Sequence, residues 1–230
     1  MTIPIFLETE FLYVIDKPHG WLTTPARLMD DPRPCLGREF QAQVDRQIFP
    51  VHRLDFEVSG LTVWAKDPNS HRIAQTWFEH ARVKKIYEAF TLKAPMLEEW
   101  REWKSKLVRG KKRAFVADYG KPAITLARTV GHGGPFSKWE LNAVTGRPHQ
   151  LRFEMFHHGF PILGDTLYGG PACVSLPHSL ALHRWLALRA VELNLSDVPE
   201  GERLGLPAIC RGPQLSLPAD LSLAPLPPSR

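Results

Sequence analysis

Short apolar runs, each followed within a few residues by proline or glycine, recur along this chain and constrain its fold more than any other feature. Such runs predict strands at residues 11–15, 61–66, 86–92, 123–130, 139–144 and 186–195. These strands outnumber the segments with helical spacing and do not alternate regularly with them. The pattern therefore predicts an α+β fold with a mainly antiparallel mixed sheet and flanking helices and loops.

Two segments have helical spacing. Asp67-Pro68-Asn69-Ser70 offers the chemistry of a helix start, and apolar side chains follow it at Ile73, Ala74, Trp77, Phe78 and Ala81. Residues 149–158 are predicted to form one or two helical turns, because Gly159-Phe160-Pro161 would end them. Residues 23–37 carry three prolines and a closing glycine, which predicts a loop.

The domain organisation predicted from these patterns is simple. Residues 1–204 are expected to form one folded domain. Residues 205–230 hold six prolines with little periodicity, which predicts a tail or an extended surface wrap. No internal repeat is visible.

Composition limits the possible partners and compartments. With 230 residues and 43% hydrophobic content, the chain can bury a sizeable core, and its net charge of +5 favours a polyanionic partner. Its three cysteines, Cys35, Cys173 and Cys210, are far apart, so no disulfide framework or zinc pair is predicted and a reducing, cytoplasmic location is expected. The N-terminus lacks the features of a signal peptide, and no apolar run approaches the length of a membrane span.

One carboxylate lies at a junction suited to chemistry. In His52-Arg53-Leu54-Asp55, the aspartate follows an arginine by two residues and precedes the apolar run that begins at Leu61. An acid at such a junction can act as a nucleophile or base, and a nearby cation would keep it ionised. The alternative for Asp55 is a loop aspartate in a structural ion pair. A lone histidine beside a strand, such as His52, more often has a structural role.

Further segments give this junction a context. They are Leu12–Gly20, Ser59-Gly60-Leu61 with Ala65-Lys66, Lys85-Ile86-Tyr87-Glu88-Ala89, Gly146–Arg152, Pro161–Gly169 and Leu182-His183-Arg184. In this order, from about residue 10 to about residue 195, they resemble the motifs of the RluA-type pseudouridine synthases, which isomerise uridine in RNA. Val58 and Pro148 stand where that family usually has threonine. Neither change removes a catalytic group, so both bear on substrate preference more than on activity.

The resemblance implies the pseudouridine synthase fold and a catalytic set of Asp55, Tyr87 and Arg152. Asp55 would be the nucleophile or base, and attack on the base, attack on the sugar and removal of a sugar proton all remain open. Arg152 would be its ion-pair partner. Tyr87 would offer a flat surface for uracil and a hydroxyl able to pass a proton, although a tyrosine of the core is the alternative.

The resemblance also implies residues that contact RNA. A uridine inside structured RNA must leave its stack before it can react, and Arg53 resembles the family residue that enters the vacated space. Lys85 suits a phosphate, and Arg147 and Gln150 belong to the motif around Arg152. The extra N-terminal RNA-binding module of many relatives would have no room before residue 10, so the catalytic domain is expected to bind RNA itself.

The densest basic run lies outside these motifs. It holds seven lysines and arginines between Arg101 and Arg113, with Lys111, Lys112 and Arg113 at its end. Such a run can grip phosphates, and Gly110 suggests a turn that would make it a hairpin tip. A plain solvated loop is the alternative.

The expected function is isomerisation of uridine to pseudouridine in structured ribosomal or transfer RNA, without metal or cofactor and without an obligate protein partner. No histidine pair has convincing metal-ligand spacing, and no glycine loop typical of phosphate binding is present. One alternative is a non-catalytic RNA-binding protein on the same fold. Another is a carboxylate-dependent hydrolase such as a glycosidase, which usually needs two carboxylates at one bond.

Overall fold

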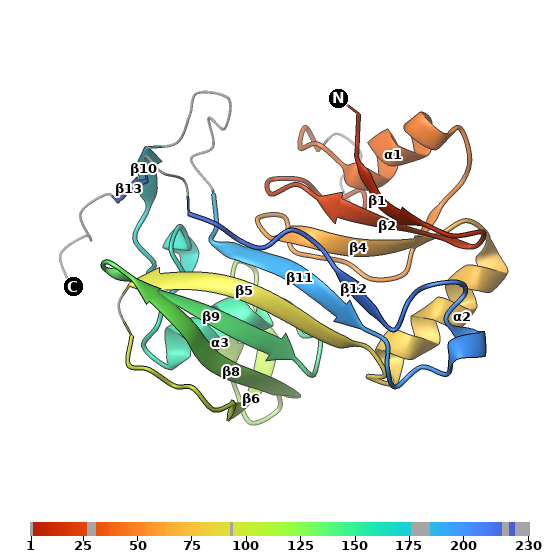
Figure 1. Cartoon of the computed structure of the whole chain (residues 1–230). Coiled ribbons are helices and arrows are strands. Elements are labelled where there is room, and N and C mark those ends of the chain that lie inside the picture. The colour runs from red at the N-terminus through yellow and green to blue at the C-terminus, as the bar shows by residue number, and fades with distance from the viewer. Residues whose placement is uncertain (1, 27–30, 93, 176–184, 218–220, 224–230) are drawn as a thin grey trace. The chain divides into compact units, whose positions relative to one another are not determined.

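A computed structural model describes residues 2–26, 31–92, 94–175, 185–217 and 221–223 (Figure 1). The chain divides into two compact units. Unit 1 consists of Met1–Lys85 and Ala190–Pro213, and unit 2 consists of Ile86–Arg189 and Gln214–Arg230.

Unit 1 is built on a sheet in which strand β4 (Ser59–Ala65) is central. The strand order is β1-β2-β4-β11, with β1 at Ile5–Glu8, β2 at Leu12–Lys17 and β11 at Leu188–Asn194, whose residues from Ala190 onward belong to this unit. Strand β3 (Phe49–Pro50) also pairs with β4, and β12 (Ile209–Arg211) pairs with β11. The pairs β1–β2, β2–β4, β3–β4 and β11–β12 are all antiparallel. Gly60 fits between these strands because it has φ of 116° and a Cβ there would lie 2.1 Å from the carbonyl oxygen of Ala190.

Helices α1 (Leu36–Val44) and α2 (Pro68–Glu79) complete unit 1. The carboxylate of Asp67 accepts hydrogen bonds from the backbone N–H groups of Asn69 and Ser70, and Pro68 occupies the first turn. This is the helix start that the sequence predicts. Helix α1 follows Cys35 without a side-chain cap, and the sequence analysis predicts no helix there.

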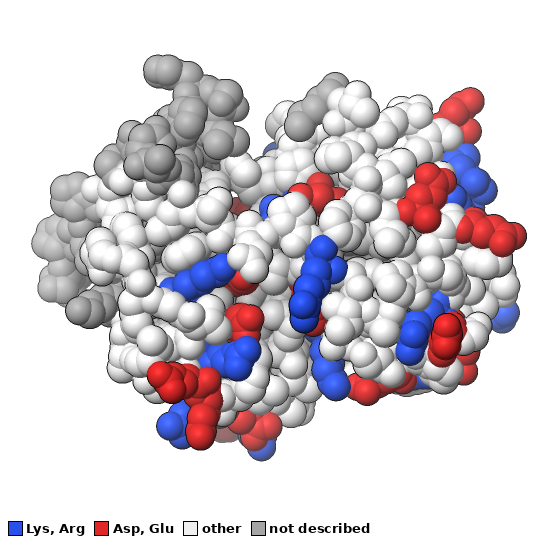
Figure 2. Space-filling model, in the orientation of Figure 1, with Lys and Arg blue, Asp and Glu red and all other residues white. Residues whose placement is uncertain are grey.

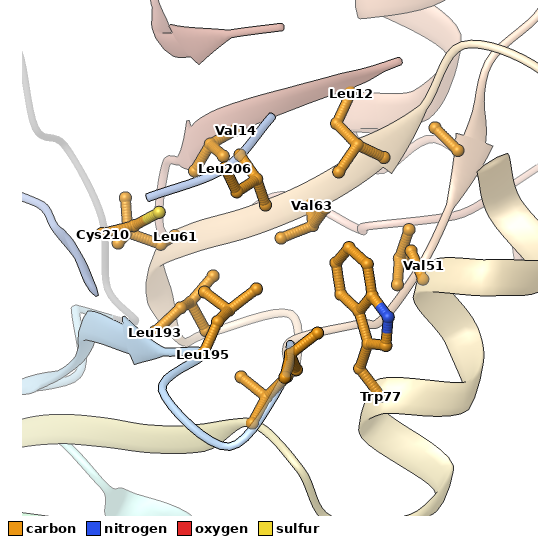
Figure 3. Packing of buried hydrophobic residues seen from close by; sticks show 14 residues of the cluster. Leu12, Val14, Val51, Leu61, Val63, Trp77, Leu193, Leu195, Leu206 and Cys210 are labelled. Atoms are coloured by element: carbon orange, nitrogen blue, oxygen red, sulfur yellow. The ribbon is translucent and has the colours of Figure 1, made fainter. Parts of the chain in front are cut away.

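Unit 1 has a hydrophobic core on each face of its sheet. Because side chains alternate along β2, Leu12 and Val14 pack on one face, and Tyr13 and Ile15 pack on the other. Figure 3 shows Trp77 of α2 turned toward Val63 and Val51 in the first core. The second core contains Leu36 and Phe40 of α1 together with Trp64. Since both faces are covered, all seven residues of β4 are buried.

Unit 2 is built on an antiparallel sheet of strand order β5-β9-β8-β6-β7. These strands are β5 (Lys84–Leu92, within unit 2 from Ile86), β6 (Arg101–Arg109), β7 (Ala114–Val116), β8 (Lys121–Gly133) and β9 (Phe136–Ala143). Helix α3 (Gln150–His157) packs against β7, β8 and β9, and a short 3-10 helix, η1 (Thr166–Tyr168), follows it. Strands β10 (Cys173–Ser175) and β13 (Ser222–Leu223) form a separate antiparallel pair.

The α+β class with a mainly antiparallel sheet is confirmed. The basic run lies on β6 and on its turn into β7, so the predicted hairpin is confirmed, and its contact with phosphates stays a prediction. Residues 205–213, which the sequence assigns to a proline-rich tail, contribute β12 to unit 1. The motif 182–184 lies outside the described residues. No helix in the described part of the chain is long and apolar enough to cross a membrane.

The core of unit 1 yields a stability prediction. Trp77 is fully buried, and its indole N–H has no hydrogen-bond partner among the described residues. Trp77→Ala should lower the free energy of unfolding by about 3–5 kcal/mol, because it leaves a large cavity. Trp77→Phe keeps most of the packing and removes the unpaired N–H, so its loss should be less than half as large. Denaturant unfolding of both variants measures this, and equal losses would contradict the packing described.

Candidate active site

Asp55 lies in the turn that leads into the central strand of unit 1. Its backbone carbonyl accepts a hydrogen bond from the N–H of Val58 at 3.2 Å, one residue before β4 begins. The residue is half-buried. The sequence prediction of an acid at the entrance to a core strand is confirmed by this geometry.

Hydrogen bonds hold the backbone on both sides of Asp55. The hydroxyl of Thr23 donates to the carbonyl of Leu54 at 3.0 Å and accepts from the N–H of Leu54 at 3.2 Å. On the other side, the ammonium of Lys17 donates to the carbonyl of Phe56 at 3.2 Å. These bonds hold the backbone that carries Asp55 before any substrate arrives, and a reacting carboxylate needs such a fixed support.

Lys17 is a fully buried cation at the end of β2. Its ammonium also donates to the carbonyls of Pro18 at 2.9 Å and Trp21 at 2.7 Å, so three backbone acceptors surround the group. Desolvation lowers the pKa of Lys17 to about 7, while the negative charge of Asp55, foremost among the nearby carboxylates, acts to raise it. Below this pKa Lys17 carries a positive charge near Asp55, and its hydrogen bond to Phe56 holds the loop that carries Asp55.

His52 has a structural role. Its Nε2 accepts the N–H of Val63 at 3.2 Å, and its ring stacks on Phe78 with centroids 4.5 Å apart. Desolvation, with a smaller effect from the charge of Lys85, lowers the pKa of His52 to about 3. The imidazole is therefore neutral, and the acceptor role of Nε2 places its proton on Nδ1.

The two predicted RNA-contacting residues of unit 1 differ in exposure. Arg53 is exposed, and its Nη1 lies 3.5 Å from the hydroxyl of Thr24. Lys85 is half-buried on β5, and desolvation lowers its pKa. Arg53 thus keeps a guanidinium directed to solvent one residue from the clamped Leu54-Asp55 backbone.

Arg152 forms a buried ion pair in unit 2. Its Nε and Nη2 donate to the two carboxylate oxygens of Asp165 at 2.7 and 2.8 Å, and both side chains are almost completely buried. The guanidinium also lies over the ring of Tyr168, 5.4 Å from its centroid. This bidentate contact fixes the plane of the guanidinium.

Tyr168 connects this pair to the rest of unit 2. Its hydroxyl accepts the N–H of Ala114, the first residue of β7, at 2.6 Å, and lies 3.1 Å from Nδ1 of His149. His149 precedes α3 with a φ of 56°, a left-handed conformation. Tyr168 is 1% exposed and packs on Phe153 of α3.

A second set of contacts anchors helix α3 to β6. Ser105 donates a short hydrogen bond to the buried carboxyl of Glu154, and the ring of His158 stacks on Trp103 at 4.1 Å. Desolvation raises the pKa of Glu154. Because Glu154 is two residues from Arg152, these contacts also fix the helix that presents the guanidinium.

The other predicted residues of unit 2 differ in their exposure and in the hydrogen bonds that their side chains already make. Tyr87 is 9% exposed on β5, and the three basic residues Lys111, Lys112 and Arg113 are exposed at the β6–β7 turn. Gln150 is buried, and its amide bonds to Ile124, Thr125, Thr145 and Arg147, so its hydrogen-bonding capacity is used inside unit 2. Its contact with RNA stays a prediction, as does that of Arg147, whose Nε donates to the carbonyl of Pro122 at 2.8 Å.

Sequence reasoning missed the supporting residues. Lys17, Thr23, Asp165 and Tyr168 position the predicted groups, yet none was assigned a role. Asp165 and Tyr168 stand inside a recognised motif, and a buried arginine needs a counter-charge, so that signal was available. The pairing of Arg152 with Asp55 stays a prediction.

Among the residues that the structure describes, no three His, Cys, Asp or Glu side chains gather in a group that could hold a metal ion.

Comparison with known proteins places these features in a family. The model of the RNA pseudouridylate synthase family matches residues 11–158, which include Asp55, Tyr87 and Arg152. An uncharacterised RNA pseudouridine synthase of Chlorobaculum parvum is 33% identical over 96% of this chain and 72% of its own length. The dual-specificity RNA pseudouridine synthase RluA of Salmonella typhi is 32% identical over 78% of this chain and 83% of its own length.

Solved structures show the same fold. Human RNA pseudouridylate synthase domain containing 1 aligns with 99% of this chain and 91% of its own, with a TM-score of 0.72 and 22% identity. Human RNA pseudouridylate synthase domain containing 4 aligns with 83% of each chain, with a TM-score of 0.64 and 25% identity. The fold and the motifs together define an RNA-modifying isomerase. This chain belongs to the RluA type of the RNA pseudouridine synthase family.

The buried lysine yields a prediction on pH. At a pH between about 7, the pKa of Lys17 in the folded chain, and its ordinary pKa of 10.5, Lys17 is protonated in the unfolded chain and neutral in the folded chain. The contribution of Lys17 to the free energy of unfolding therefore rises as pH rises through this range. Lys17→Met lacks this contribution, so its stability relative to wild type should decline from pH 7 upward. Denaturant unfolding across this range measures it, with Lys84→Met as the exposed control, and a difference independent of pH would contradict the assignment.

The Arg152–Asp165 pair yields a second prediction. Asp165→Asn keeps the shape of the side chain but removes the negative charge of a buried ion pair, which should cost about 3–5 kcal/mol of stability. Glu102→Gln removes the exposed partner of Lys104 and should cost less than about 1 kcal/mol. Thermal or denaturant unfolding compares the two, and a small loss in Asp165→Asn would show that this pair does not organise unit 2.

Proposed function

We propose that this protein converts uridine to pseudouridine in structured ribosomal or transfer RNA, with the carboxylate of Asp55 acting on the reacting nucleotide. The observation that carries the proposal is the position of Asp55, inside the matched family region and between two backbone segments held by Thr23 and Lys17. A loop aspartate with only a surface ion pair would not need this support.

The reaction is an isomerisation and needs no net oxidation or reduction. The bond from N1 of uracil to C1′ of ribose breaks, and a bond from C5 to C1′ forms. The hydrogen on C5 leaves as a proton, and N1 gains one. A carboxylate can assist by attacking C1′, attacking the base or removing a sugar proton. All three roles require Asp55 to be ionised when the nucleotide binds.

The other groups have roles that follow from their chemistry. Tyr87 offers an aromatic face on which the freed uracil can stack while it turns, and a hydroxyl that can pass a proton. The guanidinium of Arg152 is held in one plane by Asp165, and the sequence-based expectation is that it pairs with Asp55 during the reaction. Such a pair would keep the carboxylate ionised.

The names of relatives support an RNA of the ribosomal or transfer class. A relative in Pseudomonas aeruginosa is named ribosomal large subunit pseudouridine synthase D, and one in Pectobacterium carotovorum is named tRNA pseudouridine synthase C. A uridine in such RNA is stacked, so it must leave its stack to react. The exposed guanidinium of Arg53 is suited to enter the vacated space.

A protein that only binds RNA is the other candidate, and no specific observation favours it. RNA binding gains nothing from a carboxylate whose neighbouring backbone is held in place, because RNA is itself anionic. A cytoplasmic location is proposed as well, supported by three cysteines that are all free thiols.

Substitution of the carboxylate tests this proposal. Asp55→Asn should abolish pseudouridine formation, measured by nucleoside analysis of RNA from a strain lacking the protein, while RNA affinity stays within a few-fold of wild type. Affinity is expected to persist because phosphate contacts supply most of it. Glu39→Gln, at an exposed acid of α1, is the control and should remain fully active. Near-normal turnover by Asp55→Asn would refute the role of Asp55, and inactive wild-type protein on all RNA tested would refute the function.

A further inference from the structure

The β6–β7 hairpin and its connection to β8 form an exposed basic surface in unit 2. From residue 104 to residue 121 the chain has seven lysines and arginines and one acidic residue, Asp118. All seven basic residues are exposed: Lys104, Lys106, Arg109, Lys111, Lys112, Arg113 and Lys121. Among the described residues, only Lys104 of these seven forms an ion pair, with Glu102.

Two basic residues elsewhere in the unit 2 sheet have acidic partners. Arg128 of β8 pairs with Glu140 at 2.5 Å, and Lys138 of β9 pairs with the buried Glu88 at 2.8 Å. Figure 2 shows basic and acidic side chains next to one another over these strands. On the hairpin surface, by contrast, six of the seven basic side chains have no ion-pair partner among the described residues.

Two aromatic side chains of the same segment are exposed. Tyr119 is 78% exposed and Phe115 is 42% exposed. The tryptophans of the same sheet, Trp103 and Trp139, are at most 7% exposed. A phenylalanine ring that stays exposed does not gain the free energy that burial would supply. An exposed ring within a basic segment is therefore a candidate for ligand binding.

The backbone that carries these rings is ordered. The N–H of Gly120 donates to the carbonyl of Ala117 at 2.8 Å, which closes a turn with Tyr119 inside it. The N–H of Ala117 donates to the carbonyl of Lys106 at 3.1 Å, and a Cβ at Gly120 would lie 2.4 Å from that same carbonyl oxygen. The turn is thus packed directly on β6, which reduces the entropy lost when a ligand binds the rings.

The hairpin is also joined to the Arg152 cluster. The N–H of Ala114 donates to the hydroxyl of Tyr168, whose ring lies under the guanidinium of Arg152. Phe115 is the next residue after Ala114. A ligand held on the hairpin is therefore held on a surface fixed to a predicted catalytic residue of the same unit.

We propose that Tyr119 and Phe115 form a stacking platform for unpaired bases of the RNA substrate, flanked by basic side chains that hold its phosphates. The inference rests on the proposed function and adds a substrate feature, namely unpaired nucleotides next to the target. Aromatic rings stack on bases of any sequence when the bases are not already paired, and lysines and arginines hold the phosphates between them. An acidic protein would suit the charges but would leave the two rings without a specific use.

The binding test uses the full-length protein with two RNA probes of equal charge, a short oligouridylate and an RNA duplex. Tyr119→Ala should weaken binding of the oligouridylate by about five-fold or more and leave the duplex unchanged. Tyr119→Trp should restore the affinity, since a larger ring still stacks. Because Tyr119 is largely exposed, these changes leave the fold intact, and circular dichroism checks this.

Salt dependence separates stacking from charge. Tyr119→Ala should leave the slope of log K against log salt unchanged, since no phosphate contact is lost. Lys111→Glu, Lys112→Glu and Arg113→Glu together should lower that slope by about 0.7 for each phosphate contact removed from a single strand. Equal losses on oligouridylate and duplex, or wild-type affinity in Tyr119→Ala, would overturn the platform.

Turnover distinguishes this failure from failure of the function. On structured RNA, Tyr119→Ala should raise KM for pseudouridine formation while kcat stays near wild type, because the ring takes no part in bond exchange. Active wild-type protein with an unchanged KM in Tyr119→Ala would overturn the platform alone. Wild-type protein without activity on any RNA would overturn the proposed function instead.

Discussion

The ammonium of Lys17 organises the part of unit 1 on which the chemistry depends. It is buried, and it donates to three backbone carbonyls that come from the end of β2 and from the loop after Asp55. Burial of a charge is costly unless hydrogen bonds compensate it. The loop around Asp55 supplies one of those bonds, so the loop and the lysine fix each other.

Unit 2 solves a similar problem with an arginine. Arg152 is buried with Asp165 and lies on the ring of Tyr168, whose hydroxyl reaches the start of β7. Removing one partner of a buried ion pair is costly, even where the intact pair adds little net stability. The pair therefore matters mainly because it fixes the geometry of the Arg152 guanidinium. Asp55 in unit 1 and Arg152 in unit 2 are therefore each held on a support that the substrate does not have to order.

Much of this could be predicted from sequence because the signals are local. The apolar run after Asp55, the helix start at Asp67 and the turn at Gly110 each depend on neighbouring residues, and each prediction is confirmed. The acceptors of Lys17 could not be predicted, because they are backbone carbonyls that no side-chain pattern reports. Helix α1 begins without a side-chain cap after a proline-rich segment, so tertiary packing of Leu36 and Phe40 decides it. Gln150 stands in a recognised motif, yet its amide is engaged by backbone and hydroxyl groups from β8 and the preceding turn.

The most direct test of the conversion of uridine to pseudouridine follows the hydrogen on C5 of uracil. RNA from a strain lacking this protein, labelled with tritium at C5 of uridine, is incubated with the purified wild-type protein and a chelator, without added nucleotide. We expect release of tritium to water together with an equal amount of pseudouridine, and no change in the mass of unlabelled RNA treated in the same way. Retention of tritium, or release of free uracil from the chain, would contradict it.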